Sequence, residues 1–151
     1  MTKTEYAQDC LKKGFSCAQS VLSAFIEQFG LERDTALRIS SAFGGGMGGM
    51  GEVCGAVTAA FMVIGLKYGR ATPHDDEEKI KINKKVVTFM NNFLPIKGSI
   101  LCRDILGADI GSPEGLEMAT TKGLFENICP NIIRCSVEIL EEIMSDEEDA
   151  K

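Results

Sequence analysis

The stretch Gly44-Gly45-Gly46-Met47-Gly48-Gly49-Met50-Gly51, followed by the apolar segment from Glu52 to Tyr68, decides the fold class. Six glycines in eight residues cannot hold a helix. The segment after them is apolar on nearly every side, which is typical of a central helix enclosed by other helices. We therefore predict a single-domain helical bundle with a glycine-rich loop before a buried central helix.

Caps, prolines and apolar spacing predict further helices on both sides of this loop. The expected helices, including the central one, cover residues 3–13, 17–29, 35–43, 52–68, 73–92, 99–107, 113–127 and 129–144. No segment shows the strict apolar and polar alternation of a hairpin strand. The sequence thus predicts an all-α fold of seven or eight helices, with one domain over residues 1–144 and an acidic flexible tail over residues 145–151.

Composition narrows the classes of function. The formal net charge of -6 opposes binding to phosphate backbones, so we expect no nucleic acid partner. The longest charge-free apolar stretch, Val53 to Leu66, is 14 residues long, shorter than the roughly 20 that a membrane span needs. The N-terminal residues lack the basic start and apolar middle of a signal peptide, so we expect a cytoplasmic protein. Its six cysteines then indicate reduced thiols, a metal site or redox chemistry.

The six cysteines fall into two groups. Cys10 and Cys135 keep helical register with apolar neighbours, so we predict that they pack in the core. The other four, each in the first turn of a predicted helix, are Cys17, Cys54, Cys102 and Cys129. Free amides and the helix dipole favour an anion there, and a thiolate is both a nucleophile and a metal ligand. The alternative is that each is a small residue at a helix entry.

These four cysteines contain no Cys-x-x-Cys pair, which argues against a zinc ribbon or a thioredoxin motif. We predict that the helical bundle brings them together as a catalytic or metal-binding cluster. Glycine permits close backbone approach, so the loop could wrap a sulfur cluster or an anion. The glycines expected to contact such a cofactor are Gly48, Gly49, Gly51 and Gly55.

Three neighbouring features carry weaker signals. Met47 and Met50 could act as soft metal ligands, although such methionines more often pack. The glycine pattern of residues 46–51 matches a dinucleotide fingerprint, but that fingerprint needs a preceding strand and here a helix is expected. His74 lies in a polar helix entry, and we interpret it as solvent-exposed rather than as a ligand.

Four stretches in order resemble one known family, the C_GCAxxG_C_C family of redox-active proteins. They are Gly14-Phe15-Ser16-Cys17-Ala18-Gln19-Ser20-Val21, Gly48-Gly49-Met50-Gly51-Glu52-Val53-Cys54-Gly55-Ala56, Cys102-Arg103-Asp104-Ile105-Leu106-Gly107 and Cys129-Pro130. The resemblance spans nearly the whole chain. The four cysteines that mark the family correspond, residue by residue, to the four singled out above. One departure is Ala59, where the family pattern has glycine.

The resemblance implies a redox role with an unidentified redox partner. The family also resembles a domain of split-Soret cytochromes, which implies iron–sulfur ligation and a homodimer, but the chain has no Cys-x-x-Cys-His for covalent haem. Our leading hypothesis is iron–sulfur electron transfer or thiol/disulfide exchange at the four cysteines. The alternatives are a structural or sensing zinc module without redox turnover, and a helical ligand-binding or interaction protein whose cysteines only pack.

Overall fold

The computed structural model describes residues 1–145, so residues 146–151 of the expected acidic tail lie outside the described residues. Within residues 1–145 the chain forms eight α-helices, two short 3₁₀ helices and no strand, which confirms the all-α prediction. The elements are α1 (Lys3–Lys12), α2 (Cys17–Ser23), η1 (Glu27–Phe29), α3 (Arg33–Ser40), η2 (Ser41–Phe43), α4 (Gly55–Tyr68), α5 (Asp76–Lys97), α6 (Cys102–Leu106), α7 (Pro113–Thr121) and α8 (Leu124–Met144).

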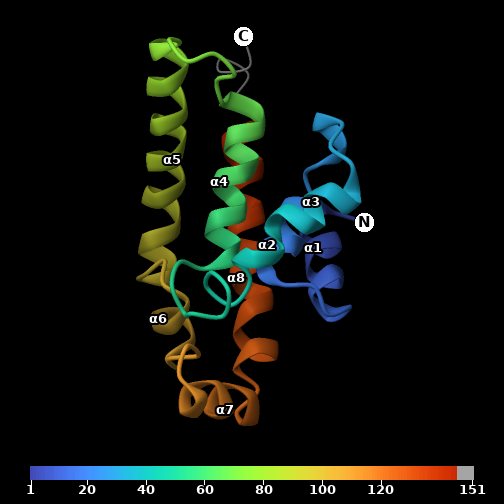
Figure 1. The fold of residues 1–151 in the computed structure, drawn as a ribbon, viewed down its shortest axis with the longest axis vertical. Coiled ribbons are helices and arrows are strands. Elements are labelled where there is room, and N and C mark those ends of the chain that lie inside the picture. Colours follow the sequence, from blue (N-terminus) through green and yellow to red (C-terminus); the bar gives the residue numbers. More distant parts are fainter. Residues whose placement is uncertain (146–151) are drawn as a thin grey trace.

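Helix α4 lies at the centre, as the sequence predicts for this apolar segment. It packs against α2, α5 and α8, and Figure 1 shows α4, α5 and α8 running side by side, with α1 to α3 on one flank and α6 and α7 at one end. Val57, Val63 and Ile64 are fully buried along it. Ala59 is also fully buried, so the core accommodates a methyl group where the family pattern has glycine.

Side-chain caps mark the starts of four of the eight described α-helices, α1, α2, α5 and α7. The Ser16 hydroxyl accepts a hydrogen bond from the Gln19 amide while the Gln19 side chain accepts one from the Ser16 amide, so that α2 begins with a capping box. At α5, the Asp75 carboxylate accepts from the Glu78 amide. These caps satisfy amide groups that the first turn would otherwise leave unpaired. They also fix the direction in which each helix enters the bundle.

The start of the last helix was predicted wrongly. The sequence predicts that this helix begins at residue 129, but α8 begins at Leu124 and continues through Cys129 and Pro130. The break between α7 and α8 is instead at Gly123, whose φ of 66° is left-handed. Proline removes one backbone donor inside a helix, and the broad apolar face of α8 compensates by packing against α1, α4 and α5. Cys129 therefore lies within a helix rather than at its start.

Helix α5 also differs from expectation. It begins at Asp76, a few residues later than predicted, and it continues past Asn92 through Pro95 to Lys97. Gly98, with a φ of 77°, ends it in the left-handed conformation that favours glycine. Among the described residues, no helix combines the length and apolar character that crossing a membrane requires.

Candidate functional site

The structure brings four remote cysteines to the wall of one pocket. Cys17, Cys54, Cys102 and Cys129, the pocket cysteines, lie at the start of α2, before α4, at the start of α6 and inside α8. The pocket has a volume of about 210 Å³. Its other lining residues are mostly apolar and are Leu11, Phe15, Ser16, Gly45, Gly46, Gly55, Ile105, Leu106, Phe125 and Ile132. Cys54, Cys102 and Cys129 are buried, and Cys17 is partly exposed.

A short backbone clamp places Cys54 next to the start of α6. The Cys54 amide donates to the Ile100 carbonyl at 2.7 Å, and the Cys102 amide donates to the Glu52 carbonyl at 2.6 Å. Between these two bonds, Val53 and Leu101 form an isolated antiparallel bridge. The relative position of Cys54 and Cys102 is therefore fixed by backbone hydrogen bonds rather than by side-chain rotamers.

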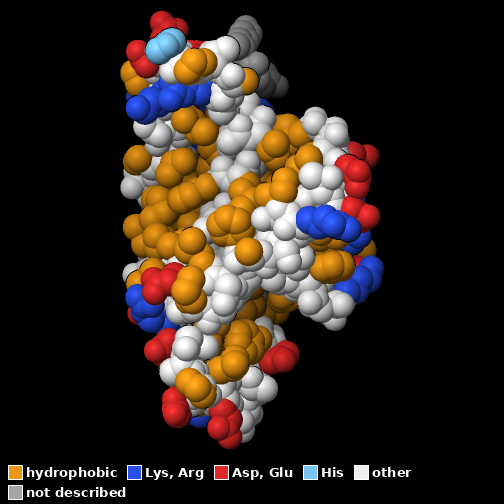
Figure 2. Space-filling view, in the orientation of Figure 1, with side chains coloured by type: hydrophobic (Ala, Val, Ile, Leu, Met, Phe, Trp, Pro, Cys, Tyr) orange, Lys and Arg blue, Asp and Glu red, His pale blue; other side chains and the backbone are white. Residues whose placement is uncertain are grey.

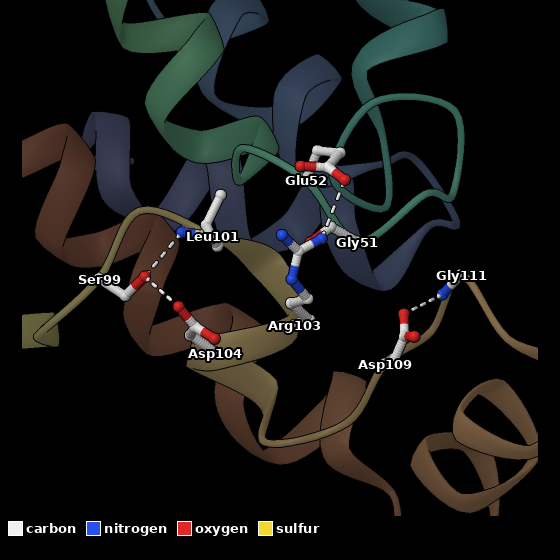
Figure 3. Close-up of polar contacts among 8 residues, drawn as sticks. All are labelled: Gly51, Glu52, Ser99, Leu101, Arg103, Asp104, Asp109 and Gly111. Carbon is white, nitrogen blue, oxygen red and sulfur yellow. Dashed lines mark hydrogen bonds and ion pairs between the residues drawn. The ribbon is translucent and has the colours of Figure 1, made fainter.

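Polar side chains reinforce the clamp on its outer side. Arg103 forms an ion pair with Glu52 at 2.9 Å, and its guanidinium also donates to the Gly51 carbonyl, as Figure 3 shows. The Ser99 hydroxyl donates to the Asp104 carboxylate at 2.8 Å and accepts from the Leu101 amide. The side chains of Arg103 and Glu52 are both more than one-third exposed, so solvent screens this pair and it contributes little to stability.

The glycine loop closes one side of the pocket with Gly45 and Gly46. All residues from Gly45 to Gly49 have φ between 63° and 77°, which makes a left-handed turn that includes Met47. A Cβ on Gly46 would lie 2.7 Å from the Cβ of Cys102. Only glycine can hold this conformation while its backbone touches the cysteine. The loop thus packs directly against one pocket cysteine.

The four glycines expected to contact a cofactor lie at different distances from the pocket. Gly55 lines it, whereas Gly48, Gly49 and Gly51 are not among its lining residues. The amides of Gly49 and Gly51 donate to the carbonyls of Gly44 and Gly45, so these two amides serve the loop itself.

Sequence reasoning missed the first three glycines of the run. Gly44 approaches α2 so closely that a Cβ there would lie 2.6 Å from the Cβ of Ser16, and Gly45 and Gly46 line the pocket. The glycine run itself was the signal that could have identified them. Its first half directly follows the end of a helix, so the chain must turn toward the interior there. Gly55 makes a similar approach, since a Cβ there would lie 2.8 Å from the Ala18 amide nitrogen.

Two pocket cysteines form a pair. The thiols of Cys17 and Cys129 share a hydrogen bond, and this bond is the main reason that the pKa of Cys17 is raised well above its usual value, with burial adding to it. The same hydrogen bond lowers the pKa of Cys129 because it stabilises a thiolate there. Cys129 is therefore the first of the pair to lose its proton.

The other two pocket cysteines have raised pKa values. Burial raises the pKa of Cys54 to about 11 and that of Cys102 to about 12. The amides of Ala56 and Val57 at the start of α4 act against burial at Cys54 but do not outweigh it. The expectation that helix starts favour thiolates is therefore wrong for the ligand-free protein, because desolvation outweighs the helix start.

The remaining candidates lie away from the pocket. Cys10 is buried in α1 with its sulfur 3.7 Å from the Ser23 hydroxyl, and Cys135 is buried in α8. His74 is exposed. Met47 and Met50 do not line the pocket, and Met50 is 58% exposed. Within residues 1–145, no group of three or more His, Cys, Asp or Glu side chains is arranged so that it could hold a metal ion.

The comparison with known families connects this geometry to a class of protein. A family model described as "Putative redox-active protein (C_GCAxxG_C_C)" matches residues 15–143, which include all four pocket cysteines. The chain belongs to the C_GCAxxG_C_C family. Searches of curated proteins and of solved structures found no match.

Proposed function

We propose that this C_GCAxxG_C_C protein carries electrons, with an iron–sulfur cluster held by the four pocket cysteines. The observation that carries the proposal is the convergence of four thiols from four segments on one apolar pocket of about 210 Å³. Thiolates are the usual ligands of [2Fe–2S] and [4Fe–4S] clusters, which take four of them. When bound, such a cluster supplies reversible one-electron transfer.

The donor arrangement suits a cluster better than a single zinc ion. A structural zinc ion needs four ligands that converge to about 2.3 Å from one point. The described residues contain no group that could hold one metal ion, and the pocket cysteines instead surround a hollow. A cluster distributes its irons, so that each thiolate can bind at a different point of the hollow. The alternative of a structural or sensing zinc module is therefore less well supported.

The chain's own residues would assist in three ways. The backbone clamp between residues 51–54 and 100–103 holds Cys54 and Cys102 in place without a bound group. The apolar lining, including Phe15 and Phe125, limits access of water. Cys54 and Cys102 release protons only at high pH when the pocket is free of metal, so cluster binding must displace protons and should strengthen as pH rises.

Anaerobic purification tests this function directly. We expect a coloured protein whose iron and acid-labile sulfide are stoichiometric with the chain, and we expect both to fall sharply in Cys17→Ser, Cys54→Ser, Cys102→Ser and Cys129→Ser. The matched controls are Cys10→Ser and Cys135→Ser, because these cysteines are buried outside the pocket. A colourless protein without iron, or equal iron in pocket and control variants, would contradict the proposal.

A second candidate function is thiol/disulfide exchange, which the hydrogen-bonded pair of Cys17 and Cys129 favours. The Cys129 thiolate would attack a disulfide of the redox partner, forming a mixed disulfide and releasing one partner thiolate. Cys17, after losing its proton, would attack the Cys129 sulfur and release the second partner thiolate. The partner disulfide gains two electrons, and the pair becomes a Cys17–Cys129 disulfide.

Mild oxidation of the metal-free protein distinguishes this candidate. Thiol exchange predicts one disulfide that joins the peptides of Cys17 and Cys129, found by mass spectrometry without reduction. Equal alkylation of all pocket cysteines before and after oxidation would argue against it.

All six cysteines are unpaired in the structure, which supports our proposal that the protein works in a reducing compartment such as the cytoplasm.

A further inference from the structure

The cysteine pocket has one side on which solvent approaches its thiols. Three of the pocket cysteines are buried, and Cys17, at the start of α2, is partly exposed. Phe15 lies two residues before Cys17, is itself half-buried and lines the pocket. The connection from α1 to α2, which carries Phe15, therefore forms the outer wall of the pocket beside Cys17.

The backbone at Phe15 is anchored, so its side chain is the part that can move. The Phe15 amide donates to the Cys10 carbonyl at 3.1 Å. Gly14, directly before it, turns the chain with a φ of 102°, and Ser16, directly after it, begins the capping box of α2. Both ends of the connection are thus held by hydrogen bonds. Access past Phe15 depends on rotation of its ring about the side-chain bonds.

A guanidinium covers the outer side of this ring. The Cζ atom of Arg33 lies 5.5 Å from the centre of the Phe15 ring, which is a cation–π contact. Arg33 is exposed at the start of α3, on the flank of α1 to α3 where Figure 2 shows Lys and Arg side chains at the surface. Since Phe15 lines the pocket and Arg33 is exposed, the ring lies between the guanidinium and the pocket.

Tyr6 holds the guanidinium in this position. The Nε atom of Arg33 donates to the Tyr6 hydroxyl at 3.2 Å, which joins α3 to α1 beside the connection that carries Phe15. A planar guanidinium that is hydrogen-bonded at its edge keeps its face available for stacking on an aromatic ring. Three segments, α1, the connection from α1 to α2, and α3, therefore contribute one residue each to a stack on the outer wall of the pocket.

We propose that Phe15 closes the cysteine pocket to solvent and that Arg33, held by Tyr6, keeps it closed. Phe15 then controls how readily reagents reach Cys17 and Cys129, and Arg33 is a positioning residue that acts through Phe15. The inference rests on the proposed function for its consequence, which is protection of a redox site from water and oxygen. Access to the thiols can be measured without iron, so failure of this inference and failure of cluster binding are separate results.

Alkylation of the reduced, metal-free chain by iodoacetamide at constant pH measures this access. Phe15→Ala is expected to raise the labelling rates of Cys17 and Cys129 about tenfold or more, because the reagent no longer waits for the ring to rotate. Arg33→Ala is expected to raise them roughly two- to fivefold, which corresponds to the loss of one exposed cation–π contact. The matched control is Arg38→Ala, which should leave the rates unchanged. Arg38 is exposed on the same helix, about 140° around it from Arg33.

The double variant tests whether Arg33 acts through Phe15. Phe15→Ala combined with Arg33→Ala should label no faster than Phe15→Ala alone, because a residue that holds the ring has no effect once the ring is gone. Cys135 provides an internal control, since it is buried in α8 outside the pocket. Its labelling rate should stay constant in all variants, which shows that the fold is intact.

The proposal fails on any of four outcomes. Phe15→Ala could leave the labelling of Cys17 and Cys129 unchanged, or Arg33→Ala could label like Arg38→Ala. The effect of Arg33→Ala could add in full to that of Phe15→Ala, which would mean that Arg33 acts independently of the ring. Labelling of Cys135 could rise as much as that of the pocket cysteines, which would mean that the variants loosen the whole fold rather than open the pocket.

Discussion

Cys17 and Cys129 line the same pocket, yet their pKa values move in opposite directions. The hydrogen bond between the two thiols raises the pKa of Cys17 and lowers that of Cys129. No thiol hydrogen bond is among the causes of the raised pKa values of Cys54 and Cys102; burial dominates there, and the charges of neighbouring pocket cysteines add to it. Immediate neighbours and burial therefore affect the pKa of each cysteine more than its position in a helix does.

These differences predict an order of alkylation in the reduced, metal-free protein. As pH rises from 6 to 10, iodoacetamide should label Cys129 before Cys54 and Cys102, because the thiolate is the reactive form. Mass spectrometry of labelled peptides would measure the midpoint for each cysteine. Labelling of Cys102 at lower pH than Cys129 would show that burial and the thiol pair do not control reactivity as described.

Cys54 should also make the stability of the metal-free protein depend on pH. Its folded pKa is about 11, above the roughly 8.5 expected in an unfolded chain. Its stabilising contribution is thus present below about pH 8.5 and is lost as pH rises toward 11, since the unfolded chain then binds fewer protons. The difference in free energy of unfolding between the unmodified chain and Cys54→Ala should shrink by about 1–2 kcal/mol between pH 7 and pH 10.

Urea unfolding at each pH, in a reductant and without metal, measures this difference. Cys54→Ala also leaves a cavity, but the cost of a cavity does not depend on pH and cancels in the comparison. A difference that stays constant or grows with pH would be incompatible with a protonated, buried Cys54.

At the scale of elements, the glycine loop shows that two glycines in one turn can have different roles. Both Gly46 and Gly49 have positive φ. A Cβ on Gly46 would lie 2.7 Å from the Cβ of Cys102 and 2.7 Å from the Glu52 amide nitrogen, whereas a Cβ on Gly49 would meet nothing within 4 Å. Gly46 is thus needed for both conformation and contact, and Gly49 for conformation alone.

Alanine substitutions should separate these roles. Gly49→Ala is expected to lower the free energy of unfolding by about 1 kcal/mol, the usual cost of a left-handed residue with a Cβ. Gly46→Ala is expected to cost about 3 kcal/mol or more, because the loop must also move away from α6. Denaturant unfolding of both variants measures the difference, and equal costs would mean that the loop does not pack on Cys102.

Several elements were predictable because their signals are local. The Ser16 cap gives the right start for α2, which however ends at Ser23 rather than at residue 29, and the apolar run gives α4 from Gly55. The start of α8 was not predictable in this way, because Pro130 is a typical helix-starting residue and only tertiary packing keeps the helix continuous through it. The roles of Gly45 and Gly46 were hidden for a related reason, since Gly46 lies against Cys102 in α6 and Gly45 lies near Ile110, both far away in the sequence.

At the scale of the whole molecule, the pocket connects four helices. One pocket cysteine comes from each of α2, α6 and α8, and one immediately precedes α4. The sequence singled out these four cysteines from predicted helix starts and family resemblance, although Cys129 lies inside α8, and their convergence depends on how the helices pack. Only the structure shows that these cysteines, which are far apart along the chain, lie on the wall of one pocket.

A group bound to all four cysteines would therefore act as a cross-link. We expect removal of iron by a chelator under anaerobic conditions to lower the melting temperature by several degrees, because binding to the folded chain alone adds to its stability. Calorimetry of the same preparation before and after iron removal measures the shift. An unchanged melting temperature would place any bound iron outside the pocket.

The connection between α4 and α5 separates the four pocket cysteines into two pairs along the chain. Residues 69–74 are all exposed, and a single tryptic cut after Arg70 would leave Cys17 and Cys54 on one fragment and Cys102 and Cys129 on the other. Each fragment alone would carry half of the pocket's sulfur ligands. We expect the nicked halves to stay associated through the buried contacts of α4, α5 and α8. The cysteine pocket would then form only when the two fragments bind each other.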